Sequence, residues 1–195
     1  MKKKEHSVNI PTIEEVENEQ KRLRHRAVYQ RTLRGTIAVL LVVAAISVLV
    51  ATLWMPVLQI YGSSMSPTLE AGQIVVSVKT NQLKTGEVVA FWQGNKLLIK
   101  RVIAGPGQWV DIDMDGNVTV DGQTLDEPYL TEKALGNCAI DLPHQVSEAH
   151  WFLMGDNRDT SVDSRSTAIG DISKDQIEGQ IIFRIWPLNK MGSIQ

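Results

Sequence analysis

The chain has 195 residues, of which 43% are hydrophobic and 22% are charged, and its formal net charge is -2. This is an ordinary globular composition, long enough for one compact domain and an attachment segment. The one cysteine, Cys138, excludes an internal disulfide framework and a cysteine-based zinc site, and nothing in the sequence assigns it a role.

Charge is distributed unevenly along the chain. Residues 1–34 contain nine lysines or arginines and five glutamates, whereas residues 61–195 contain eleven basic and seventeen acidic residues. The two parts are therefore expected to face different surroundings. The acidic character of the second part also argues against nucleic acid as a partner, because nucleic-acid binding depends on cations.

An uncharged apolar run from Gly35 to Ile60 predicts a transmembrane helix at residues 35–58, because about 20 apolar residues cross the hydrocarbon layer of a membrane. Pro56 marks its expected end. Six lysines or arginines and no acid occupy residues 21–34. Residues 1–34 are therefore predicted to be a cytoplasmic basic tail, with the rest of this single-pass protein outside the cell membrane. A cleaved signal peptide is not favoured, because its apolar core would be shorter and nearer the N-terminus.

Beyond this helix the pattern changes to short β-branched and aromatic segments separated by glycine-containing turns. The pattern predicts an external all-β domain over residues 59–195, so the expected fold class is mainly β with one N-terminal transmembrane helix. The predicted strands are QIVVSVKT, EVVAFWQ, KLLIKRVIAG, QWVDID, NVTVDG, HWFLMGD and QIIFRIWP.

Two segments contain residue types that bind metals, but neither has the pattern that a metal site requires. The segment DIDMDG, residues 111–116, copies the start of a calcium-binding loop, yet the twelfth position is Gly122 where such a loop has glutamate. A hairpin turn is predicted there. His144 and His150 lack the helical spacing of zinc ligands, so we expect loop histidines and no metal.

The loop YGSSMSPTLEAGQ, residues 61–73, contains two adjacent serines, Ser63 and Ser64, where a nucleophile could lie. A lysine can take the proton of a serine hydroxyl when the lysine is neutral. Lys100 shares its face of a predicted strand with Leu98 and Val102, and such an apolar setting lowers the pKa of a lysine. Taken alone, this segment also fits a solvated lysine on an edge strand.

Four segments, in this order, resemble the bacterial type I signal peptidases, a family of membrane-anchored Ser-Lys endopeptidases that remove signal peptides. They are GSSMSPTL, GEVVAF, KRVIAGPG and MGDNRDTSVDSR, of which the last is the most specific. The resemblance covers roughly residues 20–186. It implies a hydrolase of the serine protease class that acts in protein secretion, with a smaller β insert at about residues 106–149 of its catalytic domain.

Position by position, the resemblance implies that Ser64 is the nucleophile and Lys100 its general base. Ser161 matches a hydroxyl that orients the lysine amine, and Asp163 and Arg165 match an ion pair that supports the site. A hydroxyl suits this task because it can direct the lone pair of a neutral amine without charging it.

The residues just before Ser64 differ from the family pattern in one respect. Ser63 falls at a variable position of the motif. Some members carry a hydroxyl residue two positions before the nucleophile as an oxyanion donor, and this chain has Gly62 there. The Ser64 backbone N–H is therefore one expected donor of the oxyanion hole, and the second donor is unknown.

The implied partners are preprotein signal peptides with small residues at the first and third positions before the cut, bound as an extended strand without metal or organic cofactor. Membrane lipid is expected to cover an exposed apolar patch of Trp54, Val57, Leu58, Ile60 and Met65. The alternative is a non-enzymatic, membrane-anchored β-domain for assembly or adhesion. A self-cleaving repressor would carry a DNA-binding domain, which this sequence lacks.

Overall fold

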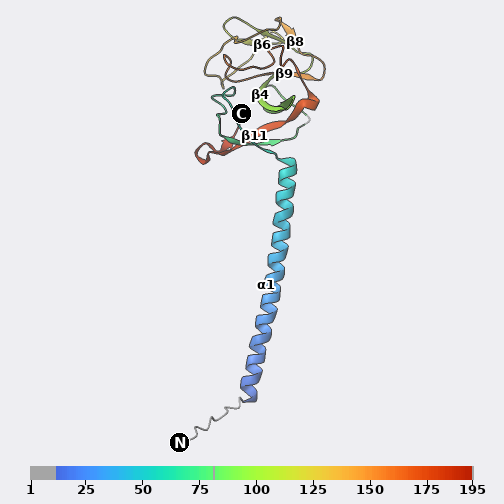
Figure 1. Cartoon of the computed structure of the whole chain (residues 1–195), viewed down its shortest axis with the longest axis vertical. Coiled ribbons are helices and arrows are strands. Elements are labelled where there is room, and N and C mark those ends of the chain that lie inside the picture. The colour runs from blue at the N-terminus through green and yellow to red at the C-terminus, as the bar shows by residue number, and fades with distance from the viewer. Residues whose placement is uncertain (1–11, 81, 195) are drawn as a thin grey trace. The chain divides into compact units, whose positions relative to one another are not determined.

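The computed structural model describes residues 12–80 and 82–194. It divides into two units, Met1–Val50 and Ala51–Gln195. Figure 1 shows the long helix α1 and, in the other unit, strands joined by loops, among them β4, β9 and β11. The expected fold class, mainly β with one N-terminal helix, is confirmed.

Helix α1 runs from Ile13 to Trp54 and is much longer than the predicted span. It begins in the charged segment because Thr12 and Glu15 cap each other. The Thr12 N–H donates to the Glu15 carboxylate at 2.9 Å, and the Glu15 N–H donates to the Thr12 hydroxyl at 3.4 Å. Of the helices described, α1 is the one long and apolar enough to cross a membrane. Residues 1–11 of the predicted basic tail lie outside the described residues.

The predicted end of the transmembrane helix at residue 58 is wrong. The helix stops at Trp54, and Val57–Gln59 form strand β1. Pro56 explains the stop, because proline has no N–H for the helical ladder and disfavours helical backbone at the residue before it. The apolar run therefore contributes both the end of the helix and the first strand.

An antiparallel sheet of eight strands is the larger of the two sheets in the second unit. Its order is β1-β2-β11-β3-β4-β9-β10, and β12 also pairs with β11. Two 3-10 turns, η1 (Lys174–Gln176) and η2 (Leu188–Lys190), flank β11. The strands are β1, β2 (Ile74–Val78), β3 (Val88–Gln93), β4 (Lys96–Ala104), β9 (His150–Met154), β10 (Ile172–Ser173), β11 (Ile177–Trp186) and β12 (Gly192–Ser193).

A second antiparallel sheet has four short strands in the order β7-β6-β5-β8. They are β5 (Trp109–Ile112), β6 (Val118–Val120), β7 (Gln123–Thr124) and β8 (His144–Gln145). All seven predicted strands are thus present in one sheet or the other. One apolar core joins the two sheets, because Val110 and Val118 pack with Ile103, Phe152 and Met154 of the large sheet.

Both faces of the large sheet are covered, because β3 alternates between two apolar cores. Val88 and Ala90 belong to one core, and Val89 and Phe91 to the other. Strand β4 lies beside β3 and has the same two faces. A charged side chain in the middle of β4 is therefore directed into a dry layer whichever face it occupies.

Buried ion pairs connect β4, the loop after β9 and the segment that follows β7. The Arg101 guanidinium binds Asp156 at 2.9 and 2.7 Å, and it lies 3.8 Å from the centre of the Tyr129 ring. The Tyr129 hydroxyl donates to Glu127 at 2.9 Å, and Glu127 in turn pairs with Arg158. The side chains of both ion pairs are at most 1% exposed, so each charge depends on its partner.

Replacing Glu127 by glutamine should destabilise the fold strongly. Glu127→Gln leaves the Arg158 guanidinium buried without a counter-charge, which should lower the free energy of unfolding by about 3–5 kcal/mol. The matched control is Glu70→Gln, since Glu70 pairs with Lys190 at a position where both side chains are about half exposed, and its cost should be a small fraction of that of Glu127→Gln. Urea denaturation in detergent, followed by tryptophan fluorescence, measures both. Equal losses would contradict the prediction.

Candidate active site

Ser64 lies in the loop after β1, and buried neighbours hold this loop in place. Met65 and Leu69 are 3% and 0% exposed and belong to the core on one face of the large sheet. The Ser66 N–H donates to the Ser63 carbonyl at 3.0 Å, which closes a tight turn around Ser64. The side chain of Ser64 is left only partly buried, on a loop that its neighbours anchor.

Lys100 comes from the middle of β4 and is 3% exposed. Its backbone pairs with Val89 of β3, a fully buried residue. Burial lowers the pKa of Lys100 to about 8, although the negative charge of Asp163 opposes this shift. A large fraction of the Lys100 amine is therefore neutral in mildly alkaline solution and can accept a proton.

Ser64 and Lys100 line the same groove, which has a volume of about 550 Å³. The structure thus brings together two residues that lie in different elements, as the sequence predicted for a nucleophile and a base. The lining comes from two segments, the chain around β1 and the first half of β4 with the turn before it. Its residues are Val57–Gly62, Ser64, Met65, Trp92, Asn95 and Leu97–Lys100.

Two strand edges without a partner border this groove. Strand β1 pairs with β2 alone, and it ends the strand order of the large sheet. Strand β4 pairs with β3 over Lys96–Arg101 and with β9 only from Arg101 onward. Within the described part of the chain, residues 96–100 therefore pair with no strand on the side away from β3. Such edges can bind an extended peptide through its backbone.

Ser161 is buried in the loop that follows β9, close to the backbone of the nucleophile. Its hydroxyl makes no hydrogen bond of ordinary geometry among the residues that the structure describes, although it helps to lower the pKa of the neighbouring Asp163 carboxylate. A Cβ atom on Gly155 would lie 2.2 Å from this hydroxyl oxygen and 2.5 Å from the Ser64 carbonyl oxygen. Glycine at position 155 is thus required for this close approach. A buried, unpaired hydroxyl of this kind calls for a functional explanation.

Asp163 and Arg165 form a fully buried ion pair that fixes the loop carrying Ser161. Arg165 Nε and Nη2 donate to the Asp163 carboxylate at 2.8 and 2.9 Å, and Arg165 also donates to the Leu135 carbonyl at 2.6 Å. The Asp163 carboxylate accepts the Gly155 N–H at 2.9 Å. The pair therefore holds both ends of the loop from residue 155 to residue 165.

The loop is also joined directly to the nucleophile. The Asn157 N–H donates to the Ser64 carbonyl at 3.0 Å. Among the described residues, the Ser64 N–H has no acceptor, and Gly62 lies exposed with a left-handed φ of 81°. The Ser64 N–H is consequently free to bind an oxyanion, while no side chain at position 62 can add a second donor.

Sequence analysis missed the role of Arg101 and of Glu127. Arg101 is 1% exposed and binds Asp156. The signal was the arginine next to Lys100 inside an apolar strand, because a charge so placed needs a buried partner. Glu127 carried no comparable signal, since its partner Arg158 is 31 residues away in the chain.

Adding one methyl group at Gly155 should disable Ser64. In Gly155→Ala the new Cβ overlaps the Ser161 hydroxyl and the Ser64 carbonyl, so the nucleophile loop must move, and a shift of about 1 Å can cost about 10²-fold in rate. The measurement is the rate at which a lactam-type probe acylates Ser64. The control is Gly192→Ala, where no atom lies within 4 Å of the added Cβ. Unchanged acylation in Gly155→Ala would refute the close packing.

Comparison with known proteins agrees with this geometry. The family model described as "Signal peptidase, peptidase S26" matches residues 33–186. The chain is 37% identical over 151 residues to signal peptidase IB of Staphylococcus aureus (strain COL), which covers 67% of this chain and 78% of that protein. It is 32% identical over 167 residues to signal peptidase I of Bacillus licheniformis, with 79% of this chain and 88% of the relative covered.

A crystal structure of a signal peptidase I from Enterococcus faecalis V583 superposes with a TM-score of 0.43 and 24% identity, over 52% of this chain and 98% of that one. The family model spans most of the chain and includes Ser64, Lys100 and Ser161. A non-enzymatic β-domain is therefore not favoured. The chain belongs to the signal peptidases of the peptidase S26 family, serine proteases that cleave signal peptides.

Proposed function

We propose that Ser64 is the nucleophile of this signal peptidase and that Lys100 is its general base. The observation that supports this best is a buried lysine with a pKa of about 8 in the same groove as a partly buried serine. A protonated lysine could not take the serine proton, so the lowered pKa is what makes the pair chemically competent.

The reaction then follows in two stages. The Lys100 amine accepts the proton of the Ser64 hydroxyl while the serine oxygen attacks the scissile carbonyl. The negative charge that forms on the carbonyl oxygen is stabilised by the Ser64 N–H, and Lys100 passes its proton to the leaving amine. An acyl-enzyme remains. Lys100 next takes a proton from water while the water oxygen attacks the ester, and it then gives this proton to the departing Ser64 oxygen, which restores the free serine and the neutral amine.

Ser161 is proposed to orient the Lys100 amine. Its buried hydroxyl lies beside the Asp163 carboxylate but makes no hydrogen bond of ordinary geometry in the described part of the chain, and a hydroxyl can hydrogen-bond a neutral amine without raising its pKa as a carboxylate would. Asp163 and Arg165 are proposed to act through the loop that they hold, since Asp163 already satisfies its charge with Arg165.

The preprotein is proposed to bind in the groove as an extended strand, using the free edges of β1 and β4. In an extended peptide, alternate side chains point to the same side. The first and third residues before the cut therefore face the same wall, which is consistent with the small residues that the family resemblance implies at both positions. The catalytic domain, expected from residue 59, is proposed to begin with β1 at Val57 and to run to residue 195, with the smaller insert at about 106–149.

The topology is also a proposal. The family is membrane-associated, and α1 has the length and apolar character of a membrane span. The six cations in residues 21–34 favour a cytoplasmic N-terminus, so the groove would face the outside, where translocated signal peptides are presented.

The expected apolar patch for lipid needs a correction. Ile60 and Met65 are 4% and 3% exposed and belong to the core. Val57 of the expected patch is exposed, together with apolar residues on β11, on η2 and just before β12. Val57 and Phe183 both oppose Val76 of β2, so they share one face of the sheet. We name the exposed residues Val57, Phe183, Trp186, Leu188 and Met191 the apolar rim.

The apolar rim is proposed to dock on the lipid surface. Val57 follows the last residue of α1 by three positions, which limits their separation to about 10 Å in a fully extended chain. Exposed apolar side chains tethered this close to a membrane helix are stabilised by burial in the interfacial region of the bilayer. Docking there would also place the groove near the membrane-embedded signal peptide.

The Ser-Lys assignment is tested by acylation of the full chain with a lactam-type probe. Ser64→Ala and Lys100→Met should each abolish acylation, whereas Ser63→Ala, the matched control, should retain most of it. In the wild type the rate should rise with pH from 6 to 9, with a midpoint near 8, because the neutral amine is the base. A rate that falls over this range would count against Lys100. Loss of acylation in Ser63→Ala alone would move the nucleophile to Ser63.

Lipid docking is tested by tryptophan fluorescence in vesicles that contain brominated lipid. Trp186 of the apolar rim is 51% exposed, and Trp109 of the small sheet is 48% exposed, which makes the two a matched pair. Trp186→Phe should remove much of the quenching by the lipid, whereas Trp109→Phe should not. Equal changes in both variants would show that the apolar rim does not contact lipid.

A further inference from the structure

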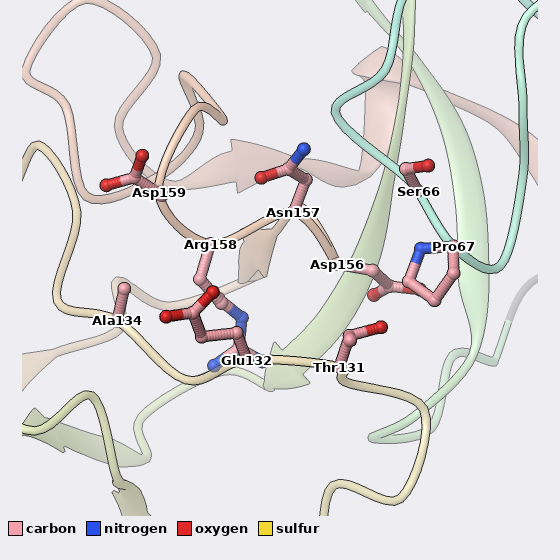
Figure 2. A pocket seen from close by; sticks show the side chains of 9 residues that line it. All are labelled: Ser66, Pro67, Thr131, Glu132, Ala134, Asp156, Asn157, Arg158 and Asp159. Carbon is pink, nitrogen blue, oxygen red and sulfur yellow. The ribbon is translucent and has the colours of Figure 1, made fainter.

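A second cavity, of about 460 Å³, lies beside the nucleophile loop and has no part in the chemistry described so far. Figure 2 shows Ser66 and Pro67 on one side, Asp159 on the other, and Asn157 between them. The segment that carries Glu132 closes the cavity from a third direction. Its volume falls in the range of about 300–1,000 Å³ that is usual for ligand pockets.

The cavity adjoins the substrate groove through the nucleophile loop itself. Ser64 and Met65 line the groove, whereas Ser66 and Pro67, the next two residues, line the cavity. Asn157 also lines the cavity, and its N–H holds the Ser64 carbonyl. A peptide cut at Ser64 must leave the groove past this loop, because the scissile bond lies at the serine oxygen. The cavity is thus placed to receive residues on the far side of the cut.

The walls of the cavity are preformed. Asp156 and Arg158 line it, but their charges are bound to Arg101 and Glu127 in fully buried ion pairs. These pairs fix the loop from residue 155 to residue 158, so little ordering is needed when a peptide enters. Preorganised walls reduce the entropic cost of binding.

Two carboxylates of the cavity remain uncompensated. Glu132 and Asp159 are exposed, and within the described residues neither forms an ion pair or a side-chain hydrogen bond. The other lining residues add hydroxyl and amide groups but no free cation. The field inside the cavity is therefore negative and favours a positively charged side chain.

We propose that this cavity binds the first residues of the mature chain, after the cut, and that Glu132 and Asp159 favour a lysine or arginine there. The proposal rests on the assignment of Ser64 as nucleophile. Selectivity arises because the cationic side chain gains attraction from two carboxylates, whereas an acidic side chain is repelled by both. Interactions with exposed charges are weak individually, so the preference of lysine over glutamate should be about tenfold in kcat/KM at low salt.

The test measures kcat/KM of the full-length enzyme in detergent on a set of preproteins that differ at one position. Lysine, glutamine or glutamate is placed in turn at each of the first four positions after the cut. At the position that enters the cavity, the order should be lysine, then glutamine, then glutamate. The difference should shrink in about 1 M salt, because screening weakens exposed charges.

Variants assign the preference to the two carboxylates. The combined change Glu132→Gln and Asp159→Asn should bring the ratio of lysine to glutamate preproteins close to one, and each single change should lower it in part. Changing both to lysine should invert it. Asp175→Asn, an exposed carboxylate outside the cavity, is the control and should keep the wild-type ratio.

Each outcome bears on a distinct claim. Equal kcat/KM for all preproteins at every position would overturn the proposal while leaving the peptidase activity intact. A preference that survives in the doubly substituted enzyme would assign it to other groups and would also overturn it. If the wild-type enzyme cleaved none of the preproteins, this result would contradict the assignment of Ser64. The acylation test addresses that assignment separately.

Discussion

Exclusion of water from one amine, that of Lys100, is the constraint on which the site depends. A lysine in water is protonated at neutral pH and cannot act as a base. Its burial in β4 lowers its pKa to about 8, which makes the neutral form accessible. The two apolar cores on β3 and β4 therefore serve chemistry as well as stability, because they keep this strand dry on both faces.

Burial alone would not suffice if a nearby carboxylate paired with Lys100. The acids around it are Asp156 and Asp163, and each already has an arginine of its own, Arg101 and Arg165. Arg165 in addition lowers the pKa of Lys100 by repulsion. Among the buried cations that the structure describes, the ion pairs thus leave Lys100 without a carboxylate partner. This arrangement explains why so costly a set of charges lies beside the groove.

In the binding mode that we propose, the same ion pairs determine where the substrate lies. They hold the loop after β9 against the loop of Ser64, and so separate the groove on one side from the second cavity on the other. The groove has free strand edges and apolar lining, which suits an extended signal peptide. The cavity has two free carboxylates. The two sides of the cut thus meet different chemistry, although both are built around one loop.

Much of the fold and of the site could be predicted from the sequence, because the signals are local. Period-two patterns located all seven expected strands, the uncharged run indicated a membrane helix, and the motif segments pointed to Ser64, Lys100 and Ser161. The end of the span was predicted four residues too late, since apolar residues 57–59 fit a helix and a strand equally well.

Other features depend on pairings between distant segments, which no local pattern encodes. Glu127 forms an ion pair with Arg158, and Gly155 lies between the Ser161 hydroxyl and the Ser64 carbonyl. Ile60 and Met65 are buried, whereas Trp186 and Leu188 are exposed. By itself the sequence determined the helix, the strands and the residue types able to do the chemistry, through their period, charge and order. Only the tertiary structure decided which charges neutralise one another, which apolar residues remain exposed and how dry Lys100 is, because burial is a property of all the packed segments together.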